Sequence, residues 1–190
     1  MKRIAIFASG SGTNAENIAR YFEGSDLAEV TYILTNNPDA GVIARARKLG
    51  IPVVVFDRTS FYKSDRILDL LKKTEIDLIV LAGFMMLVPN KLVNAFNGRI
   101  VNIHPALLPK FGGKGMYGSY VHEAVVAAGE TESGITIHYV NEQYDEGQII
   151  FQARCTVTAD DNAESVAEKV HQLEYEHFPK VIETLLAKDN

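Results

Sequence analysis

Short apolar runs rich in β-branched residues alternate with amphipathic stretches through the first hundred residues. Runs of about 4–8 nearly uniformly apolar residues are typical of parallel strands that are covered on both faces. The runs predicted as strands are Arg3–Ala8, Val30–Thr35, Val53–Phe56, Leu78–Ala82 and Ile100–His104. The helices predicted between them are Asn14–Glu23, Gly41–Leu49 and Tyr62–Thr74. This alternation predicts a doubly wound, mostly parallel, Rossmann-like α/β sheet with right-handed crossovers.

A glycine-rich loop at residues 111–118 ends this alternation. The elements predicted beyond it are a helix at Val121–Ala128, an antiparallel hairpin of Gly134–Val140 and Ile149–Val157, and a final helix at Asn162–Lys188. Strict apolar alternation in the first hairpin strand predicts that this strand is half buried. A break or restart of the final helix is expected at Pro179, because proline removes a helical hydrogen bond. No repeat or linker divides the chain, so a single domain over residues 1–190 is predicted.

Composition excludes several classes of protein and of site. The chain has 190 residues, 47% of them hydrophobic, and a formal net charge of −5. Its basic residues are scattered, which disfavours a nucleic-acid partner. No stretch approaches the roughly 20 apolar residues of a membrane span, and the N-terminal apolar run is too short for a signal peptide, so we expect a cytoplasmic protein. The single cysteine, Cys155, excludes an internal disulfide, and the histidines lack metal-ligand spacing, so no metal is expected. Monomer and homodimer both stay open.

The segment Ser9–Ala15 matches the G-x-G-x-x-G/A fingerprint at the point where the first strand leads into the first helix. Glycines allow a ligand to approach the backbone closely, and the helix dipole favours an anion. The alternative is an ordinary tight turn with Thr13 or Asn14 as the helix N-cap. A dinucleotide site would need an acidic residue at the end of the second strand, where this chain has Thr35–Asn37. The segment therefore predicts a cradle for a monophosphate.

Two polar side chains stand at the carboxyl end of an otherwise apolar strand. Asn102 and His104 are two residues apart, so they share one face of it, at the edge where ligands bind in open α/β sheets. An asparagine can donate to a developing oxyanion, and a histidine can shuttle a proton. Asp145, in the polar loop of the hairpin, would stabilise the imidazolium if the fold brought it close. The alternatives are a buried pair that satisfies loop backbone and an ordinary polar turn.

Two further features suggest ligand contacts. Glu174 interrupts the apolar stripe that Val170 and Phe178 form on the final helix. Because a buried carboxylate is costly unless paired, it needs a ligand hydroxyl or amine, or an internal Arg or Lys. The uncharged, methionine-rich segment Leu81–Pro89 could line a slot for a flat heterocycle, although such runs are more often simply core.

Together these segments resemble the folate-dependent formyltransferases. The matching segments, in the order of the family, are Ser9–Asn14, Leu81–Met85, Asn102–Pro109, Ser133–His138 and Tyr144–Gly147. The Asn-x-His-Pro-x-Leu-Leu-Pro pattern is specific to formyltransferases as a group. The segment Ser9–Asn14, hereafter the glycine loop, is similar to that of the branch that formylates a ribonucleotide.

The resemblance implies an enzyme of purine biosynthesis that transfers the formyl group of 10-formyltetrahydrofolate to the amine of glycinamide ribonucleotide. These two small molecules would be its partners. The resemblance implies a catalytic trio of Asn102, His104 and Asp145. It implies substrate contacts at Gly12, Thr13, Asn14 and Glu174, and folate contacts at Met85, Met86, Leu87, Val88, Asn102, Asn141 and Asp145. The phosphate half would span about residues 1–100, and the folate and catalytic half about 80–190.

Two alternatives come from other classes. A nucleotide-binding oxidoreductase fits the glycine fingerprint but lacks the acidic residue expected near Thr35–Asn37. A non-catalytic ligand sensor could keep the phosphate loop while losing catalysis, and the presence of Asn102, His104 and Asp145 argues against it. A different formyl acceptor within the family is a milder alternative.

Overall fold

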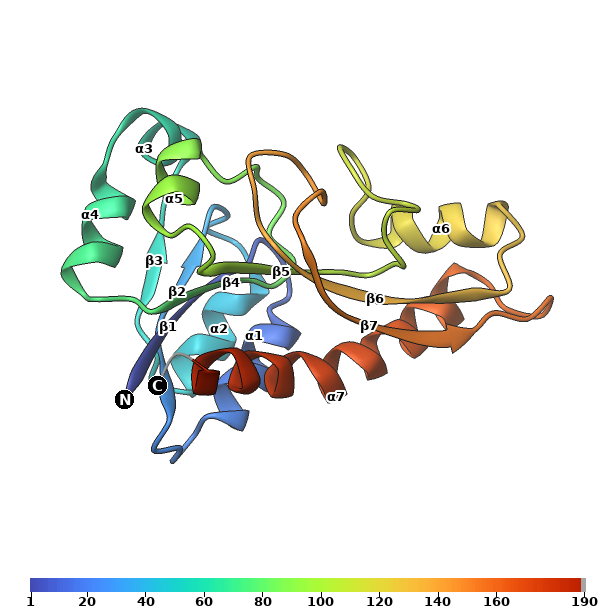
Figure 1. The fold of residues 1–190 in the computed structure, drawn as a ribbon, viewed down its shortest axis with the longest axis horizontal. Helices are drawn as coiled ribbons and strands as arrows, with labels where there is room; N and C mark the ends of the chain where they lie inside the picture. Colours follow the sequence, from blue (N-terminus) through green and yellow to red (C-terminus); the bar gives the residue numbers. More distant parts are fainter. Residues whose placement is uncertain (189–190) are drawn as a thin grey trace.

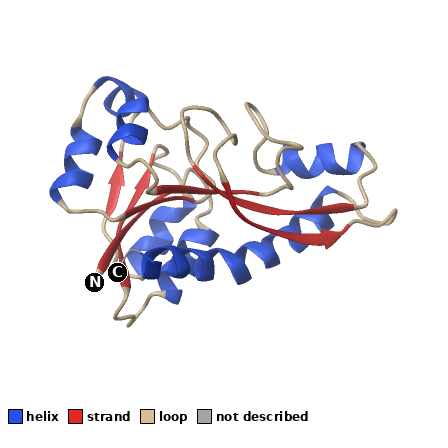
Figure 2. Ribbon diagram, in the orientation of Figure 1, coloured by secondary structure: helices blue, strands red, loops and turns tan. Residues whose placement is uncertain are grey.

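The computed structural model describes residues 1–188. It contains one sheet in the order β3-β2-β1-β4-β5-β6-β7, shown in Figures 1 and 2. The strands are β1 (Lys2–Phe7), β2 (Ala28–Thr35), β3 (Val53–Val55), β4 (Leu78–Leu81), β5 (Ile100–His104), β6 (Glu132–Tyr139) and β7 (Ile149–Thr156). Strands β1 to β5 pair in parallel, whereas β6 and β7 add two antiparallel pairings at one edge. The predicted doubly wound, mostly parallel α/β fold with a C-terminal antiparallel hairpin is confirmed.

Helices cover both faces of the sheet. They are α1 (Thr13–Tyr21), α2 (Gly41–Lys48), α3 (Arg58–Lys63), α4 (Arg66–Lys73), α5 (Asn90–Ala95), α6 (Ser119–Ala127) and α7 (Ala163–Lys188). In Figure 1, α1, α2 and α7 lie on one side of the sheet, and α3, α4 and α5 lie on the other. No helix within residues 1–188 is both long and apolar enough to cross a bilayer.

A hydrophobic cluster lies on each face of the sheet, which explains why the sequences of the strands are unbroken apolar runs. In β1, Ile4 and Ile6 belong to the hydrophobic cluster that includes residues of α1, α2 and α7, whereas Ala5 and Phe7 belong to the cluster that includes residues of α3, α4 and α5. All four side chains are buried. Because neighbouring residues of a strand point to opposite faces, a sheet covered on both sides needs apolar residues at every position.

The strand order reverses direction between β1 and β4, and this reversal identifies the edge of the sheet where a ligand is expected to bind. The chain runs outward from β1 through β2 to β3 and then returns to β4 on the other side of β1. Ligands in open α/β sheets bind at such a switch point, beyond the carboxyl ends of the strands. The loops after β1 and β4 are joined there, because Ser9 N donates to the Gly83 carbonyl at 3.0 Å and Met85 N donates to Ser9 Oγ at 3.0 Å.

The single helix predicted at Tyr62–Thr74 is wrong, since two helices, α3 and α4, occupy residues 58–73. Helix α3 starts earlier than predicted because Asp57 and Ser60 form a reciprocal capping box. It ends at Ser64, which is extended and whose hydroxyl donates to the Ser60 carbonyl at 2.8 Å. Helix α5 was not among the predicted elements.

The expected break at Pro179 is also wrong, because α7 runs through it without interruption. A proline has no backbone N–H, so the carbonyl of Tyr175, four residues earlier, loses its helical donor. Asn17 of α1 supplies a substitute, its Nδ2 donating to Tyr175 O at 3.0 Å. A side chain from a distant helix therefore satisfies this carbonyl.

The first hairpin strand, β6, is not half buried as predicted, because it is buried on both faces from Ser133 to His138. The polar side chains on its second face have protein partners. Thr136 Oγ1 donates to the Ala106 carbonyl at 2.7 Å and accepts from Leu108 N at 3.0 Å. The loop that follows β5 therefore covers the face of β6 that the alternation assigned to solvent.

Candidate active site

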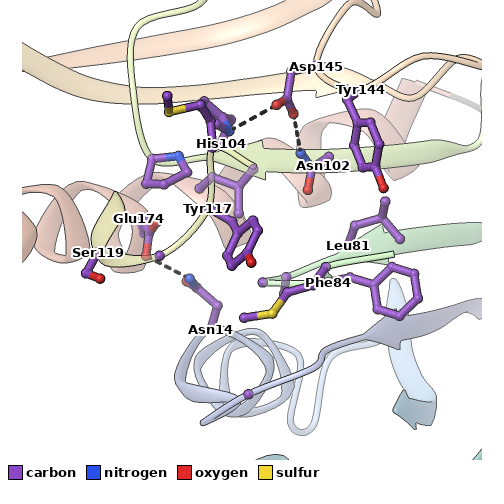
Figure 3. A pocket seen from close by; sticks show the side chains of 18 of the residues that line it. Asn14, Leu81, Phe84, Asn102, His104, Tyr117, Ser119, Tyr144, Asp145 and Glu174 are labelled. Atoms are coloured by element: carbon purple, nitrogen blue, oxygen red, sulfur yellow. Dashed lines mark hydrogen bonds and ion pairs between the residues drawn. The ribbon is translucent and has the colours of Figure 1, made fainter. Parts of the chain in front are cut away.

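A cavity of about 930 Å³ lies at the switch point and extends toward α6 and α7. Figure 3 shows side chains that line it. Four loops that are distant in the sequence meet here, namely residues 10–14, 81–88, 113–119 and 143–145. The cavity is therefore bounded by the loops after β1 and β4, the glycine-rich loop before α6, and the hairpin loop between β6 and β7.

The glycine loop is held close to α2. Gly12, the N-cap of α1, has φ +75°, a conformation that side-chain-bearing residues rarely adopt. A Cβ on Gly12 would lie 2.3 Å from Val42 Cγ2, so no side chain fits at this position. Gly12, Thr13 and Asn14 all line the cavity. The first backbone N–H groups of a helix have no helical acceptor, so this turn can bind an anion.

Asn14 and Glu174 meet at the same end of the cavity. Asn14 Nδ2 donates to Glu174 Oε2 at 2.8 Å, and the glutamate is only 6% exposed (Figure 3). The internal partner of this carboxylate is thus a neutral amide rather than an Arg or Lys. Burial raises the pKa of Glu174, and the hydrogen bond from Asn14 opposes that rise. Asn14 Oδ1 is buried and has no partner among residues 1–188, so the pair retains capacity to bind a ligand.

Asn102, His104 and Asp145 come together at the centre of the cavity, as Figure 3 shows. Asp145 Oδ2 lies 3.5 Å from His104 Nδ1, and its Oδ1 lies 3.5 Å from Asn102 Nδ2. Gly113 N donates to Asp145 Oδ2 at 2.9 Å. Burial acts to raise the pKa of Asp145, but contacts with His138, His104 and Gly113 outweigh it, and the pKa is lowered. The carboxylate is therefore ionised at neutral pH.

Both ring nitrogens of His104 face acceptors. Nε2 lies 2.7 Å from the Phe111 carbonyl and Nδ1 faces Asp145, so the imidazolium can donate on both sides. Burial lowers the pKa of His104, while the Asp145 carboxylate acts in the opposite direction. Burial therefore disfavours the charged form of His104, and the Asp145 carboxylate offsets part of this cost.

His138 is a further member of this cluster that no sequence pattern predicts. Its Nδ1 lies 2.8 Å from the Tyr139 carbonyl, which can only accept, so Nδ1 carries the hydrogen. Its Nε2 lies 3.1 Å from Asn102 Nδ2 and 3.6 Å from Asp145 Oδ1. Position 138 is paired with position 102 in the antiparallel register of β5 and β6. That register could have suggested the contact, had the pairing been known.

The methionine-rich loop forms the opposite wall of the cavity. Met85, Met86, Leu87 and Val88 all line it. The rings of Tyr117 and Tyr144 project into it in Figure 3. An apolar wall with aromatic side chains suits a flat heterocycle.

Asn141 does not reach this cavity. It is not among the lining residues, and its Oδ1 accepts from Gln143 N at 2.9 Å, which closes a local turn. Besides His138, two more histidines outside the predicted set line the cavity, His122 of α6 and His171 of α7. His122 is 3% exposed, and its Nδ1 has no partner in the described part of the chain. Among residues 1–188, no group of three or more His, Cys, Asp or Glu side chains could hold a metal ion.

Comparison with known proteins identifies the family. A family model described as formyl transferase matches residues 2–182. A phosphoribosylglycinamide formyltransferase of Haemophilus influenzae is 38% identical and aligns over 100% of this chain and 92% of its own length. The crystal structure of a phosphoribosylglycinamide formyltransferase from Bacillus halodurans superposes with a TM-score of 0.88 at 39% identity, covering 100% of this chain and 97% of that one.

Plant relatives are longer than this chain. A chloroplastic phosphoribosylglycinamide formyltransferase of Arabidopsis thaliana is 43% identical over 187 residues, which cover 95% of this chain. The chain spans 64% of the length of that relative and 61% of one from Vigna unguiculata. The family match nonetheless includes all the strands and the whole of the cavity lining. The chain therefore belongs to the formyl transferase family.

Proposed function

We propose that this protein transfers the formyl group of 10-formyltetrahydrofolate to the primary amine of glycinamide ribonucleotide. The products are formylglycinamide ribonucleotide and tetrahydrofolate, and the reaction is a step of de novo purine biosynthesis. The names of the bacterial and plant relatives support this choice of substrate.

The observation that carries the proposal is the continuity of the cavity. One cavity of about 930 Å³ joins the glycine loop, the trio of Asn102, His104 and Asp145, and the methionine-rich wall. Cavities that bind small molecules are commonly about 300–1,000 Å³, and this one has room for parts of two substrates. It offers an anion site at one end, an apolar slot at the other, and acid–base groups between them.

The nucleotide occupies the end of the cavity next to α1. The backbone N–H groups at Gly12, Thr13 and Asn14 hold its phosphate, with the N-terminal end of the helix dipole supplying favourable potential. The Glu174 carboxylate accepts a hydrogen bond from one ribose hydroxyl, and Asn14 Oδ1 accepts from another. These contacts direct the amine toward the centre of the cavity. The folate lies along Met85, Met86, Leu87 and Val88, and so presents its formyl group to the same centre.

The trio then acts on the transferring group. The amine attacks the formyl carbon, forming a C–N bond and a tetrahedral oxyanion. Asn102 donates to that oxyanion, and His104 does so through Nε2 once the substrate displaces its contact with the Phe111 carbonyl. Such a donor typically contributes about 10²–10³ in rate. The contact of Asn102 Nδ2 with Asp145 Oδ1 is long, at 3.5 Å, so an amide hydrogen is available to the oxyanion.

Collapse of the intermediate requires one proton to move from the amine to N10 of the folate. Asp145 accepts it, directly or through a water, and the proton returns to N10 as the bond between the formyl carbon and N10 breaks. Asp145 also offsets the cost of charging His104 in a buried site. No covalent intermediate on the protein is involved.

The division of the chain follows from the same placement. We propose a single domain over residues 1–190, with phosphate binding in about residues 1–100 and folate binding and catalysis in about 80–190. Asn141 stays a prediction as a folate contact. Cytoplasmic localisation likewise stays a prediction from the sequence, and monomer and homodimer both stay open.

A direct transfer assay tests the proposal. Purified protein is mixed with glycinamide ribonucleotide and 10-formyltetrahydrofolate, and the formylated nucleotide is detected by mass spectrometry. We expect product from the native protein and a loss of about 10³-fold in turnover for Asp145→Asn, with both substrates still bound. Glu142→Gln, a change of the same kind at an exposed position of the same loop, is the control and retains turnover. Near-normal turnover by Asp145→Asn would contradict the assigned role, and absence of product from the native protein would contradict the acceptor.

A further inference from the structure

Helix α2 holds two successive carbonyl groups of the glycine loop. The carbonyl of Gly10 accepts from Val42 N at 3.1 Å, and the carbonyl of Ser11 accepts from Arg45 Nε at 2.8 Å. The backbone is close as well, because a Cβ on Gly41 would lie 3.3 Å from Ser11 Cα. The loop is therefore fixed from the side that faces α2.

The direction of these two carbonyls also fixes the direction of the N–H groups of Ser11 and Gly12. The only cis peptide bond within residues 1–188 precedes Pro109, so both peptides of the loop are trans. In a trans peptide the carbonyl and the following N–H point in opposite directions. Because the carbonyls of Gly10 and Ser11 point toward α2, the N–H groups of Ser11 and Gly12 point away from it. Ser11 and Gly12 line the cavity and no residue of α2 does, so these N–H groups point toward the cavity. Successive N–H groups on one side form an anion-binding concavity.

The guanidinium of Arg45 is itself anchored. It forms an ion pair with Glu16, on the first turn of α1, so a single side chain connects α2, the glycine loop and α1. The Glu16 carboxylate also forms an ion pair with Arg20, whose Nη2 lies 2.8 Å from Glu16 Oε1. Arg20 makes no contact with Ser11, so the two arginines share one partner but differ in the bond to the loop.

We propose that Arg45 is a positioning residue for the substrate phosphate, which it never touches. By holding the Ser11 carbonyl it keeps the N–H of Gly12 turned toward the phosphate. The inference rests on the proposed function only in taking the phosphate of a ribonucleotide as the bound anion. The effect of Arg45 is confined to ligands that carry the phosphate.

Calorimetric titration with glycinamide ribonucleotide tests this without requiring turnover. Arg45→Met removes the donor and keeps an unbranched side chain as far as the position of Nε, while Arg20→Met removes the other ion pair of Glu16 and serves as the matched control. We expect the Kd of the nucleotide to rise about tenfold in R45M and to stay unchanged in R20M. Rates of formylation are measured in parallel with glycinamide riboside, which lacks the phosphate. Its kcat/KM is expected to be equal in native protein, R45M and R20M.

Each other outcome is informative. An unchanged nucleotide Kd in R45M, or an equal loss for nucleotide and riboside, overturns the positioning role. Nucleotide that binds the native protein but is never formylated overturns the proposed function and leaves the Kd comparison valid. If R45M does not fold, Arg45→Lys keeps a cation beside Glu16 without the planar guanidinium, and the same rise in nucleotide Kd is expected from it.

Discussion

The side-chain amide of Asn14 donates a 2.8 Å hydrogen bond to Glu174, 160 positions away in the sequence. The bond joins the first turn of α1 to the middle of α7 where both line the cavity. It leaves a buried carboxylate beside a neutral partner, an arrangement that costs stability.

Glu174→Gln should therefore separate stability from binding. Burial raises the pKa of Glu174 in the folded protein above its value in the unfolded chain. As pH rises above the pKa of the unfolded chain, the folded protein therefore becomes less stable, because ionising this carboxyl costs more in the fold than in the unfolded chain. We expect the free energy of unfolding of the variant to equal or exceed that of the native protein at pH 7, measured by urea denaturation. We expect the Kd for glycinamide ribonucleotide to rise about tenfold, because a neutral amide replaces a charged acceptor.

Glu168→Gln, at an exposed position of the same helix, is the control and should alter neither quantity. A large loss of stability in Glu174→Gln would show that the carboxylate is a structural anchor. Unchanged nucleotide affinity would remove Glu174 from the proposed binding site.

Gly12→Ala tests the close contact between the glycine loop and α2. The substitution places a Cβ 2.3 Å from Val42 Cγ2 and forces alanine into φ +75°. The positive φ costs about 1–2 kcal/mol and the overpacking about 1–3 kcal/mol, so a loss of roughly 2–5 kcal/mol in unfolding free energy is expected. Gly24→Ala separates the two causes, because Gly24 has φ +73° with open space around it and should show only the first cost. Equal losses in both variants would mean that Val42 moves aside freely.

A buried histidine makes stability depend on pH in a defined window. Burial, and secondarily the neighbouring His171 and His104, lower the pKa of His122 from 6.5 to about 4. Between those two pH values the unfolded chain is protonated at His122 while the folded protein is not, so stability falls as pH falls from about 6.5 to about 4. At about 1.4 kcal/mol per pKa unit, the contribution approaches about 3 kcal/mol.

His122→Gln, which does not titrate, should remove that contribution. Urea denaturation at pH 7 and pH 4.5 is expected to show a smaller loss of unfolding free energy in the variant than in the native protein. His177→Gln, a change at a less buried histidine of α7, should retain the native pH dependence. Parallel curves for native protein and His122→Gln would contradict the lowered pKa.

Much of the fold was predictable because its causes are local. A strand such as Ile100–His104 needs apolar residues on both faces, and that requirement is visible in the sequence itself. The position of Asn102 and His104 at the carboxyl end of that strand followed from the same pattern. The break between α3 and α4 was missed because a serine hydroxyl, not a proline or glycine, ends the first helix.

The remaining parts depend on tertiary contacts. The distance between Asp145 and His104 is set by the pairing of β5 with β6 and by the path of the hairpin loop, neither of which has a periodic signal. Asp145 also has φ +56°, a left-handed conformation that is uncommon for residues other than glycine, although Asp adopts it more often than most. His138 was overlooked because a histidine on an apolar strand is more often simply buried. The sequence therefore identified His104 and Asp145 as candidates but did not show that they lie close together.

The uninterrupted path of α7 through Pro179 provides a final test of how a distant side chain replaces a helical hydrogen bond. Asn17 donates to the Tyr175 carbonyl, which the proline leaves without its usual N–H. Asn17→Ala should reduce the unfolding free energy by about 1 kcal/mol in the native background. In a Pro179→Ala background the restored N–H supplies the donor, so the same substitution should cost little. The two costs, measured by urea denaturation, should differ by about 0.5–1 kcal/mol, and equal costs would mean that the amide does not substitute for the missing bond.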